Sequence, residues 1–314
     1  MTRLSVVMPV RNEATYIEEA IGSLQSQAFS DWELIVVDDH STVATTAIVS
    51  RKRARDSRIR MVPNRGWGQV QALNTGYAES EAPYIKFMDG DDVLSPRFSA
   101  LAETLCRSDA SYHDIEIVRS DLKSINILRL SSKFKDAPFV SCFRAGVVHP
   151  SRSAWTFSRR VGARLFPLPA RLPSPHEDYW IAVSIKRHAA GLDYVPAPLY
   201  RYRQHGDQTF RGIYNFSPDV VSFRARAMLG IIDVMESEEE FGLGHPEIGR
   251  RLAAMRTYYG ILALQSAGVI EILGADLSLG ERAKLLVVKK FPSAAARLSR
   301  FKSGLTSRHA GAWK

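Results

Sequence analysis

The sequence predicts an α/β fold, in which a doubly wound, mainly parallel sheet flanked by helices is followed by a helical C-terminal region. Two observations support this fold class. Four strand-helix alternations fall within the first 110 residues, a pattern typical of a parallel sheet with crossover helices. From Pro218 onward the apolar spacing is helical.

Each element follows from its local pattern. Apolar blocks near residues 5–9, 33–37, 59–62 and 84–88 predict the four strands, because continuous apolar runs suit inner strands covered on both faces. Apolar side chains at helical spacing follow each strand and predict helices, beginning near Ile17, Val43, Val70 and Phe98.

The pattern weakens between Asp109 and Arg171, where only 115–118 indicates a strand. A helix is expected to begin at 175–180, followed by strand-like segments at 192–196 and 199–205. Helices are then expected over 221–235 and 247–273, ahead of a basic tail.

Composition excludes several classes of protein. With 314 residues, 45% hydrophobic and 24% charged, the chain has the composition of an ordinary soluble protein. Its two cysteines form no disulfide framework, and the first residues lack a secretory signal. No run reaches the roughly 18 apolar residues of a membrane span. We therefore expect a cytoplasmic protein.

The net charge of +9 comes from the tail. Residues 281–314 contain nine basic side chains and one acid, Glu281, whereas the preceding part has 33 basic and 32 acidic residues. A nearly neutral body argues against a nucleic-acid partner. Apolar residues at helical spacing over 294–305 predict a basic amphipathic helix on an anionic membrane, at the inner face of the plasma membrane. The alternative is a helix packed on the body with a solvated charged face.

An acidic cluster ends the fourth predicted strand. Asp89, Asp91 and Asp92 surround Gly90, and their mutual repulsion would be costly without a positive group among them. Mg²⁺ or Mn²⁺ suits such oxygen ligands and commonly adds substrate phosphates to one or two carboxylates. The alternative is a solvated Asp-Gly turn, while the spacing of an EF-hand loop is absent.

A second acidic pair, Asp38 and Asp39, ends the second strand at the same predicted edge of the sheet, where it can accept hydrogen bonds from a base or sugar. The glycine patterns of dinucleotide and P-loop sites are missing. A phosphate ligand must then be neutralised by metal and basic side chains, for which Arg201, Arg203 and His205 are the candidates.

Asp178 lies at the start of a predicted helix, after a proline-histidine pair and before two aromatic residues. Acids at this position commonly cap free backbone N–H groups. A carboxylate facing the metal site would instead deprotonate an incoming hydroxyl. Both interpretations fit the sequence.

Taken together, these segments resemble the family-2 glycosyltransferases of the GT-A fold over residues 3–210. Six segments in the family's order and spacing carry the resemblance: 5–13, 32–41, 72–76, 89–92, 177–178 and 200–205. Arg11 and His40 depart from the family pattern, which usually has an uncharged residue and a glycine there.

The resemblance implies roles for individual residues. Asp178 is implied as general base, Asp91 as a ligand of Mg²⁺ or Mn²⁺, and His205 as a further metal or diphosphate contact. The remaining candidates for binding the nucleotide sugar are Pro9, Arg11, Glu13, Asp39, Asn74, Asp89, Arg201 and Arg203.

The expected domains are a glycosyltransferase domain at 1–215, divided at 108/109 into a nucleotide-sugar half and an acceptor half, and a helical region at 216–314. The expected reaction moves a sugar, with inversion, from a nucleoside-diphosphate sugar, with UDP as the expected nucleotide, to a hydroxyl of a glycan or lipid-linked acceptor in surface polysaccharide synthesis. A catalytically inactive nucleotide-sugar binder and a nucleotidyltransferase are the alternatives.

Overall fold

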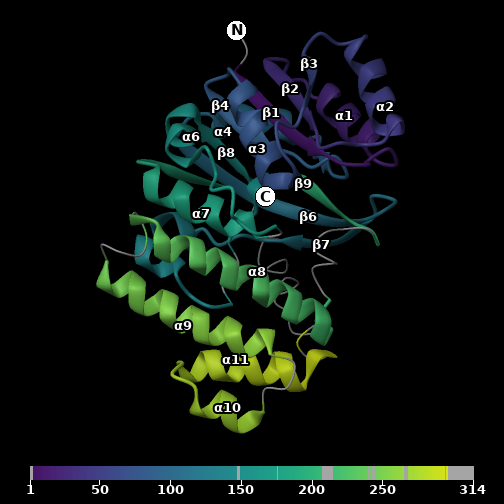
Figure 1. Ribbon diagram of the computed structural model, residues 1–314. Coiled ribbons are helices and arrows are strands. Elements are labelled where there is room, and N and C mark those ends of the chain that lie inside the picture. The colour runs from purple at the N-terminus through teal and green to yellow at the C-terminus, as the bar shows by residue number, and fades with distance from the viewer. Residues whose placement is uncertain are drawn as a thin grey trace, which may run out of the picture. The chain divides into compact units, whose positions relative to one another are not determined.

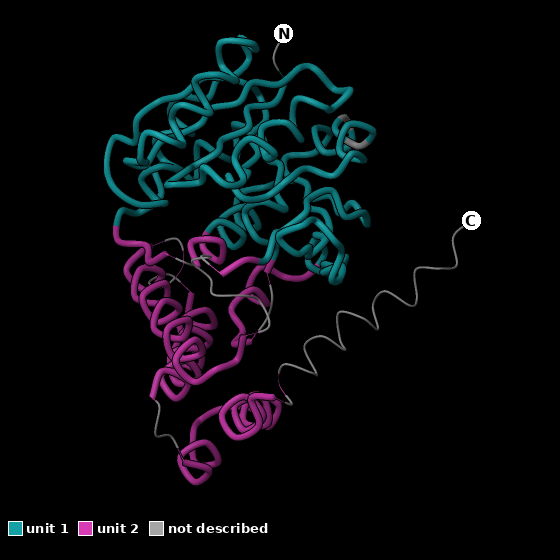
Figure 2. Tube along the Cα trace, turned by 90° about the vertical axis from the view of Figure 1, so that its right-hand side faces the viewer, with its two compact units in different colours: residues 1–136, 150–170, 181–204 teal, residues 137–149, 171–180, 205–314 magenta. Residues whose placement is uncertain are grey.

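The computed structural model describes residues 3–146, 149–174, 176–206, 215–239, 241, 245–264, 268–293 and 295. They form two compact units (Figure 2). Unit 1 contains residues 1–136, 150–170 and 181–204, and unit 2 contains 137–149, 171–180 and 205–314. The second unit is larger than the predicted helical region because two earlier segments pack with its helices.

Unit 1 begins with a parallel half-sheet of spatial order β3-β2-β1-β4 (Figure 1). All three pairings are parallel, and the strands span β1 (Leu4–Val10), β2 (Trp32–Asp38), β3 (Ile59–Pro63) and β4 (Tyr84–Phe87). The intervening helices are α1 (Ile17–Gln25), α2 (Val43–Arg53) and α3 (Gly68–Glu79). The predicted alternation of strands and helices is confirmed.

Close packing between α3 and β1 depends on a glycine. A Cβ atom on Gly76 would lie 2.2 Å from Cγ1 of Val7, well inside van der Waals contact. In α1, the predicted apolar face is buried, through Ile17, Ala20, Ile21 and Leu24. Both helices are thereby fixed on the sheet, so the loops at its carboxyl edge have a rigid base.

The other half of the sheet is mixed. From β4 the order continues through β8 (Trp155–Ser158), β6 (Ala110–Arg119), β9 (Leu192–Gln204) and β5 (Val93–Leu94). The strand β7 (Ser124–Leu128) pairs with β6. The β4-β8 and β6-β8 pairings are antiparallel, whereas β6 and β9 run parallel.

Shorter elements complete unit 1. They are α4 (Phe98–Leu105), α5 (Lys133–Asp136), α6 (Arg159–Leu165) and a 3-10 turn, η2 (Arg152–Ala154). The helix α7 (Glu177–His188) begins in unit 2 and continues in unit 1. The two strand-like segments predicted at 192–196 and 199–205 form one strand, β9, whose register against β6 shifts beside His113 and Asp114.

Unit 2 consists mainly of α8 (Pro218–Ser237), α9 (Pro246–Ala263), α10 (Val269–Gly274) and α11 (Leu279–Lys290), with the 3-10 turn η1 (Phe139–Cys142). The prediction of one helix over 247–273 is wrong, since α9 ends at Ala263 and Leu264 is extended. The predicted tail helix at 294–305 lies outside the described residues, apart from Ala295. Within the described part, no helix has both the length and the apolarity needed to cross a membrane.

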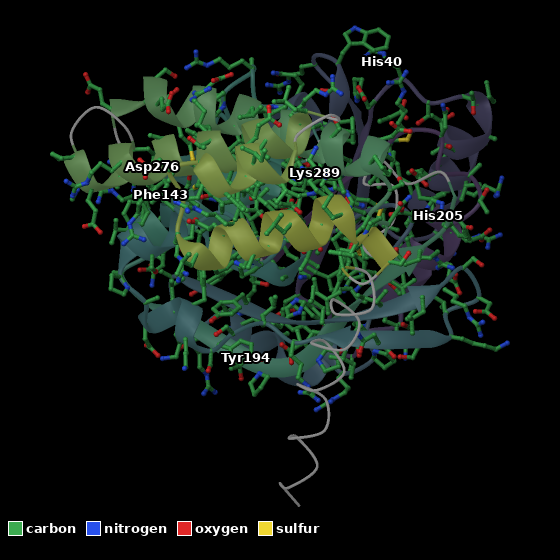
Figure 3. The ribbon with its side chains drawn as sticks, turned by 90° about the horizontal axis from the view of Figure 1, so that it is seen from below. His40, Phe143, Tyr194, His205, Asp276 and Lys289 are labelled. Atoms are coloured by element: carbon green, nitrogen blue, oxygen red, sulfur yellow. The ribbon has the colours of Figure 1, made fainter. Side chains whose placement is uncertain are left out.

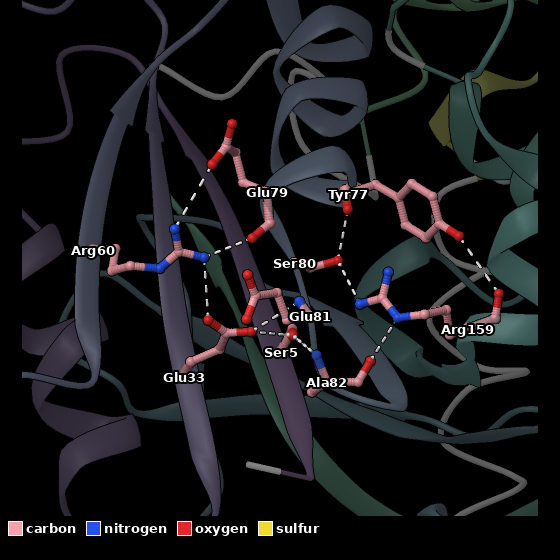
Figure 4. Close-up of polar contacts among 9 residues, drawn as sticks. All are labelled: Ser5, Glu33, Arg60, Tyr77, Glu79, Ser80, Glu81, Ala82 and Arg159. Carbon is pink, nitrogen blue, oxygen red and sulfur yellow. Dashed lines mark hydrogen bonds and ion pairs between the residues drawn. The ribbon is translucent and has the colours of Figure 1, made fainter. Parts of the chain in front are cut away.

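The amino ends of the parallel strands are held by a dense polar network (Figure 4). Ser5 Oγ donates to Glu33 at 2.6 Å, and the Glu81 N–H donates to the same carboxylate at 3.1 Å. Arg60 contacts both Glu33 and Glu79. Burial raises the pKa of Glu33, but the hydrogen bonds from Ser5, Glu81 and Arg60 more than offset this and lower it.

Candidate functional site

The two predicted acidic loops flank β1 at the carboxyl edge of the parallel half-sheet. On one side, the N–H of Asp39 donates to the Val10 carbonyl at 2.8 Å. On the other, the N–H of Met88, which precedes Asp89, donates to the Val7 carbonyl at 3.0 Å. The strand order β2-β1-β4 therefore brings Asp39 and the acidic cluster to one edge of one sheet, as expected from the sequence.

Asp39 is held in a buried polar cradle. It is 5% exposed, and its Oδ1 accepts a hydrogen bond from Asn64 Nδ2 at 2.7 Å. Both carboxylate oxygens also lie 3.0 Å from the N–H of Gly68. Gly68 has a φ of +80°, a backbone conformation that residues with side chains rarely adopt. The cradle fixes the carboxylate as an oriented hydrogen-bond acceptor.

An exposed aromatic stack adjoins this cradle. His40 and Trp67 stack with ring centroids 3.7 Å apart, and His40 Nε2 lies 2.9 Å from the Gly66 carbonyl (His40 is labelled in Figure 3). The φ of His40 is +60°. This left-handed backbone explains why a glycine is common there in the family that the sequence resembles.

The acidic loop lies directly against the segment that follows β1. A Cβ on Gly90 would lie 2.9 Å from Cγ1 of Val10 and 3.2 Å from Cγ of Glu13. The chain can therefore approach this closely only with glycine between the carboxylates. The predicted residue Glu13 thus lies beside the acidic loop.

Asp92 points into the protein. It is fully buried, and its Oδ1 accepts a hydrogen bond from the N–H of Arg203 at 2.7 Å. Burial is the main cause that raises the pKa of Asp92 well above its usual range, and the neighbouring Asp91 and Asp89 raise it further. We infer that Asp92 supports the loop from within.

Arg203 clamps the same loop. The residue is 1% exposed. Its guanidinium donates hydrogen bonds to the Asp91 carbonyl at 2.7 Å and to the Ser120 carbonyl at 2.5 Å. A third bond, of 2.6 Å, goes to Glu19 on α1. The sequence suggested that Arg203 binds a diphosphate, but these contacts use its guanidinium inside the protein and give it a positioning role.

Asp89 is oriented by two residues that are distant in sequence. Its N–H donates to the Tyr200 hydroxyl at 2.9 Å. Its carboxylate forms an ion pair with Arg152 of η2, with side chains 20% and 11% exposed, respectively. The acidic loop therefore carries an internal counter-charge in addition to any ion that it binds.

The three carboxylates thus have different surroundings. Asp92 is buried and Asp89 faces Arg152, whereas Asp91 is half-buried at the tip of the loop. No group of three His, Cys, Asp or Glu side chains suited to a metal occurs among the described residues. One carboxylate with substrate phosphate oxygens is a normal Mg²⁺ or Mn²⁺ site, so Asp91 fits the predicted ligand.

Other predicted residues of unit 1 have contacts within the protein. Asn74 exchanges two hydrogen bonds with the backbone of Leu168, at 3.0 and 2.7 Å. Arg201 Nε donates to Glu116 at 2.9 Å. Both contacts fix neighbouring segments. Pro9 is half-buried within β1 and Arg11 is exposed just beyond it.

The remaining predicted residues belong to unit 2. Asp178 is half-buried in the first turn of α7, after Glu177, which is 1% exposed. Burial lowers the pKa of the preceding His176 to about 4, despite the opposing effect of Asp178. His205 follows β9 directly and is half-buried (Figure 3).

Sequence reasoning missed Arg152, Tyr200 and Asn64 as parts of this edge. Within the segment 200–205 the sequence predicts roles for Arg201, Arg203 and His205 but none for Tyr200, and it predicts no role for Asn64 or Arg152. The adjacency of Asn64 to the end of β3 was a usable signal, because β3 ends at the same edge as β2.

A buried lysine lies within the strand that delivers the acidic loop. Lys86 on β4 is fully buried, and its ammonium lies 2.7 Å from the Ser153 carbonyl and 3.1 Å from His113 Nε2. Burial lowers the pKa of Lys86 to about 7. His113 Nδ1 lies 2.8 Å from the Asp114 carbonyl and must carry the proton there, which leaves Nε2 to accept from Lys86.

Similar chains are known. A Bacillus subtilis protein described as an uncharacterized glycosyltransferase, EpsJ, is 36% identical over 115 residues, 37% of this chain and 32% of that protein. A Campylobacter jejuni protein, GalNAc(5)-diNAcBac-PP-undecaprenol beta-1,3-glucosyltransferase, is 35% identical over 106 residues, 33% of this chain and 34% of that protein. The matched part therefore spans about a third of each relative.

Solved structures share the fold more completely. TarS 1-349 of S. aureus in complex with UDP-GlcNAc has a TM-score of 0.60 at 15% identity, covering 98% of this chain and 92% of that one. Mannosyltransferase PcManGT from Pyrobaculum calidifontis, in complex with GDP-Man and Mn²⁺, has a TM-score of 0.59 at 17% identity, covering 99% and 88%. The fold is therefore that of the GT-A glycosyltransferases, as the sequence predicts.

The family itself is shown by sequence. The model described as glycosyl transferase family 2 matches residues 5–161. This match covers half of the chain and includes both acidic loops, the Asn64 turn and η2. The chain belongs to glycosyl transferase family 2.

Proposed function

We propose that the protein transfers a sugar from a nucleoside-diphosphate sugar to a hydroxyl group of a glycan or lipid-linked acceptor, with inversion at the anomeric carbon. The observation that carries the proposal is the acidic edge of the sheet, where Asp39 is fixed as an acceptor and Asp91 occupies the tip of a clamped loop. Family membership supplies the reaction class.

The donor we propose is a UDP-sugar. Support comes from the solved structures of TarS, which contain UDP-GlcNAc or UDP. In this chain, the Asp39 carboxylate would accept a hydrogen bond from an N–H of the base, because both its oxygens are oriented by Asn64 and Gly68. Pro9, Arg11 and Glu13 would border the nucleoside from the loop after β1.

The acceptor class rests on the names of relatives. The Campylobacter jejuni relative is named for an undecaprenol-linked substrate, and a Staphylococcus aureus relative is named poly(ribitol-phosphate) beta-N-acetylglucosaminyltransferase, 27% identical over 154 residues. Both names describe glycan synthesis. We propose a hydroxyl of a surface glycan or its lipid-linked precursor as the acceptor here.

The residues of this chain would divide the work. Asp91 would hold Mg²⁺ or Mn²⁺, which when bound neutralises the diphosphate of the donor. Asp89 and His205 are further proposed contacts of the donor or its metal. Asp178 would take the proton of the acceptor hydroxyl as its oxygen bonds to the anomeric carbon. The bond from that carbon to the diphosphate oxygen breaks, and the nucleoside diphosphate leaves.

The first test concerns the nucleotide site. Asp91→Asn should abolish the increase in melting temperature that UDP produces with Mn²⁺, because the loop tip loses its charged ligand. Asp136→Asn, at an acid whose side chain is 71% exposed on α5, is the control and should respond like the wild type. Retention of the Mn²⁺-dependent shift in Asp91→Asn contradicts the metal assignment.

The second test concerns the general base. Asp178→Asn should leave UDP binding unchanged and reduce turnover roughly 100- to 10,000-fold, measured as release of UDP with acceptor present. Asp219→Asn removes a matched acid from the first turn of α8 and should keep full turnover. Wild-type binding of the donor without any transfer or hydrolysis would instead favour the inactive binding protein.

A further inference from the structure

An unusual concentration of exposed apolar side chains lies at one part of unit 2. Nine large apolar side chains are exposed in the described part of the chain, and six of them come from residues 264–291. These six are Leu264, Val269, Ile270, Leu273, Leu279 and Phe291. Single exposed apolar residues are ordinary on a soluble protein, but a group from one short stretch marks an interaction surface.

Two of the elements that carry them pack together. The helix α11 contacts both α9 and α10, and it lies between them in Figure 1. On α10, Ile272 is fully buried, whereas Ile270 is 86% exposed. The short helix therefore binds the unit through one side and leaves an apolar opposite side in solvent.

Charge is unevenly distributed along the α10–α11 pair. The ammonium of Lys289 donates to the carbonyl of Leu264, and it interacts electrostatically with Glu271 beside Ile270. This brings the end of α9, the start of α10 and the end of α11 to one place. Lys290 and Phe291, the latter 63% exposed, follow there.

We call this place the apolar–basic end, consisting of Leu264, Ile270, Lys289, Lys290 and Phe291. The acids Asp276 and Glu281 lie in the turn after α10 and the first turn of α11, away from the carboxyl end where Lys289 lies (Asp276 and Lys289 are labelled in Figure 3). The charge of the pair is thus uneven, because Lys289 and Lys290 outnumber Glu271 at this end.

We propose that the apolar–basic end docks on an anionic membrane surface, with Ile270 and Phe291 entering the interface and Lys290 near the lipid headgroups. Apolar side chains flanked by lysines suit the interface of an anionic bilayer. A second copy of this chain is the less suitable occupant, because pairing the same ends would bring like charges together. The nine basic residues from 282 onward, against no acid after Glu281, add to this preference.

The inference rests on the proposed function only for its biological purpose, because a lipid-linked acceptor would lie at the membrane surface. Its physical test is independent of catalysis. The test is co-sedimentation of the full chain with two kinds of vesicle, one of phosphatidylcholine alone and one that also contains about 30% of the anionic lipid phosphatidylglycerol. Binding to the anionic vesicles should be at least tenfold stronger.

The double variant Ile270→Asp/Phe291→Asp should lose at least tenfold in binding to the anionic vesicles. The matched control is Val43→Asp, because Val43 is 82% exposed at the start of α2 in unit 1, and it should bind like the wild type. Lys290→Glu should weaken binding about fivefold at low salt and less at high salt. Equal binding by the wild type and the double variant overturns the proposal.

Light scattering separates the rival occupant. If the wild type is a dimer that the double variant converts to a monomer while vesicle binding stays unchanged, the surface is an interface between copies and the proposal fails. UDP release with a soluble acceptor and no vesicles should be equal in all these proteins. If the wild type transfers no sugar but binds vesicles through the apolar–basic end, the proposed function is wrong and the proposed membrane contact is still supported.

Discussion

The two ends of the parallel half-sheet treat carboxylates in opposite ways. At the amino end, Glu33 receives hydrogen bonds from Ser5 and Glu81 and pairs with Arg60, so its pKa is lowered. At the carboxyl end, three aspartates crowd one loop, and the pKa of Asp92 is raised by burial and by its acidic neighbours. The amino end uses its acid to join strands, whereas the carboxyl end keeps acids in positions that favour a cation or a donor group.

The difference shows that the sheet tolerates repulsion between carboxylates at its carboxyl end, where other residues hold the loop in place. The acidic loop remains in place because Arg203, Tyr200 and Gly90 fix its backbone. Such support allows a charged site to be preorganised for its ligand. At the amino end the fully paired network needs no such external support.

The largest effect is expected at the carboxyl end, where it tests whether Asp39 binds a ligand or only stabilises the fold. Asp39→Asn should weaken UDP binding at least tenfold, because a charged acceptor is worth roughly 1.5 to 3 kcal/mol. The free energy of unfolding should fall by no more than about 1 kcal/mol. Isothermal titration calorimetry and urea unfolding measure the two quantities. A large loss of stability with normal UDP affinity would make Asp39 a structural residue like Glu33.

The next effect is expected at the amino end. Glu33→Gln should leave UDP affinity unchanged and lower the free energy of unfolding by about 1 kcal/mol at pH 7. The folded-state pKa of Glu33 lies below its unfolded value of 4.5, so its contribution is present above that pH and is lost as the pH falls. The difference in unfolding free energy between wild type and variant should therefore shrink as the pH falls below 4.5.

Urea unfolding at several pH values checks this second prediction. Arg60→Met is the companion variant, since the Arg60 side chain is 39% exposed and its loss should cost less than about 1 kcal/mol. A gap that persists unchanged at acid pH would show that charge pairing is not what Glu33 contributes.

The last effect is a dependence of stability on pH rather than a loss at one pH, and it lies between the two ends, at Lys86. Its folded-state pKa of about 7 is below the ordinary value of 10.5. The unfolded chain therefore binds more protons between these pH values, and stability should rise with pH by roughly 1 kcal/mol per unit in that window. Lys86→Met should lose this part of the slope. If the unfolding free energies of wild type and Lys86→Met change with pH in the same way, the pKa of Lys86 is not lowered by burial.

The sequence predicted the parallel half-sheet well because its signals are local. Each strand there is a continuous apolar run, and each helix has an apolar face, as in Ile17 to Leu24 of α1. The same rules failed where pairing is distant. The strand β8 has only four residues, and β7 is half-exposed at an edge of the sheet, so neither forms a recognisable apolar run.

The helical region shows a second limit. Apolar spacing continues from Leu262 to Val269 and Leu273, so the pattern predicts one helix across 247–273. Instead α9 ends at Ala263, Leu264 is extended, and α10 begins after Gly268. Periodicity records which side chains are apolar, whereas the break depends on backbone conformation and on packing with α11.

The candidate site was predictable in its acids and much less so in its bases. Asp39, Asp89 and Asp91 end strands, and their common edge follows from parallel pairing. Which carboxylate an arginine meets depends on tertiary contacts, so Arg203 was expected at a phosphate and instead holds the loop. Arg152 lies in a segment without any interpretable pattern.

The bond from the Asp89 N–H to the Tyr200 hydroxyl joins residues 111 positions apart. During synthesis on the ribosome, every aspartate of the acidic loop emerges long before the tyrosine that holds its backbone and the arginine at position 203. A nascent chain that ends before β9 therefore contains Asp89, Asp91 and Asp92 but lacks the hydrogen bonds from β9 that hold their loop. Competence for ligand binding arrives late in translation, with the last strand of the sheet.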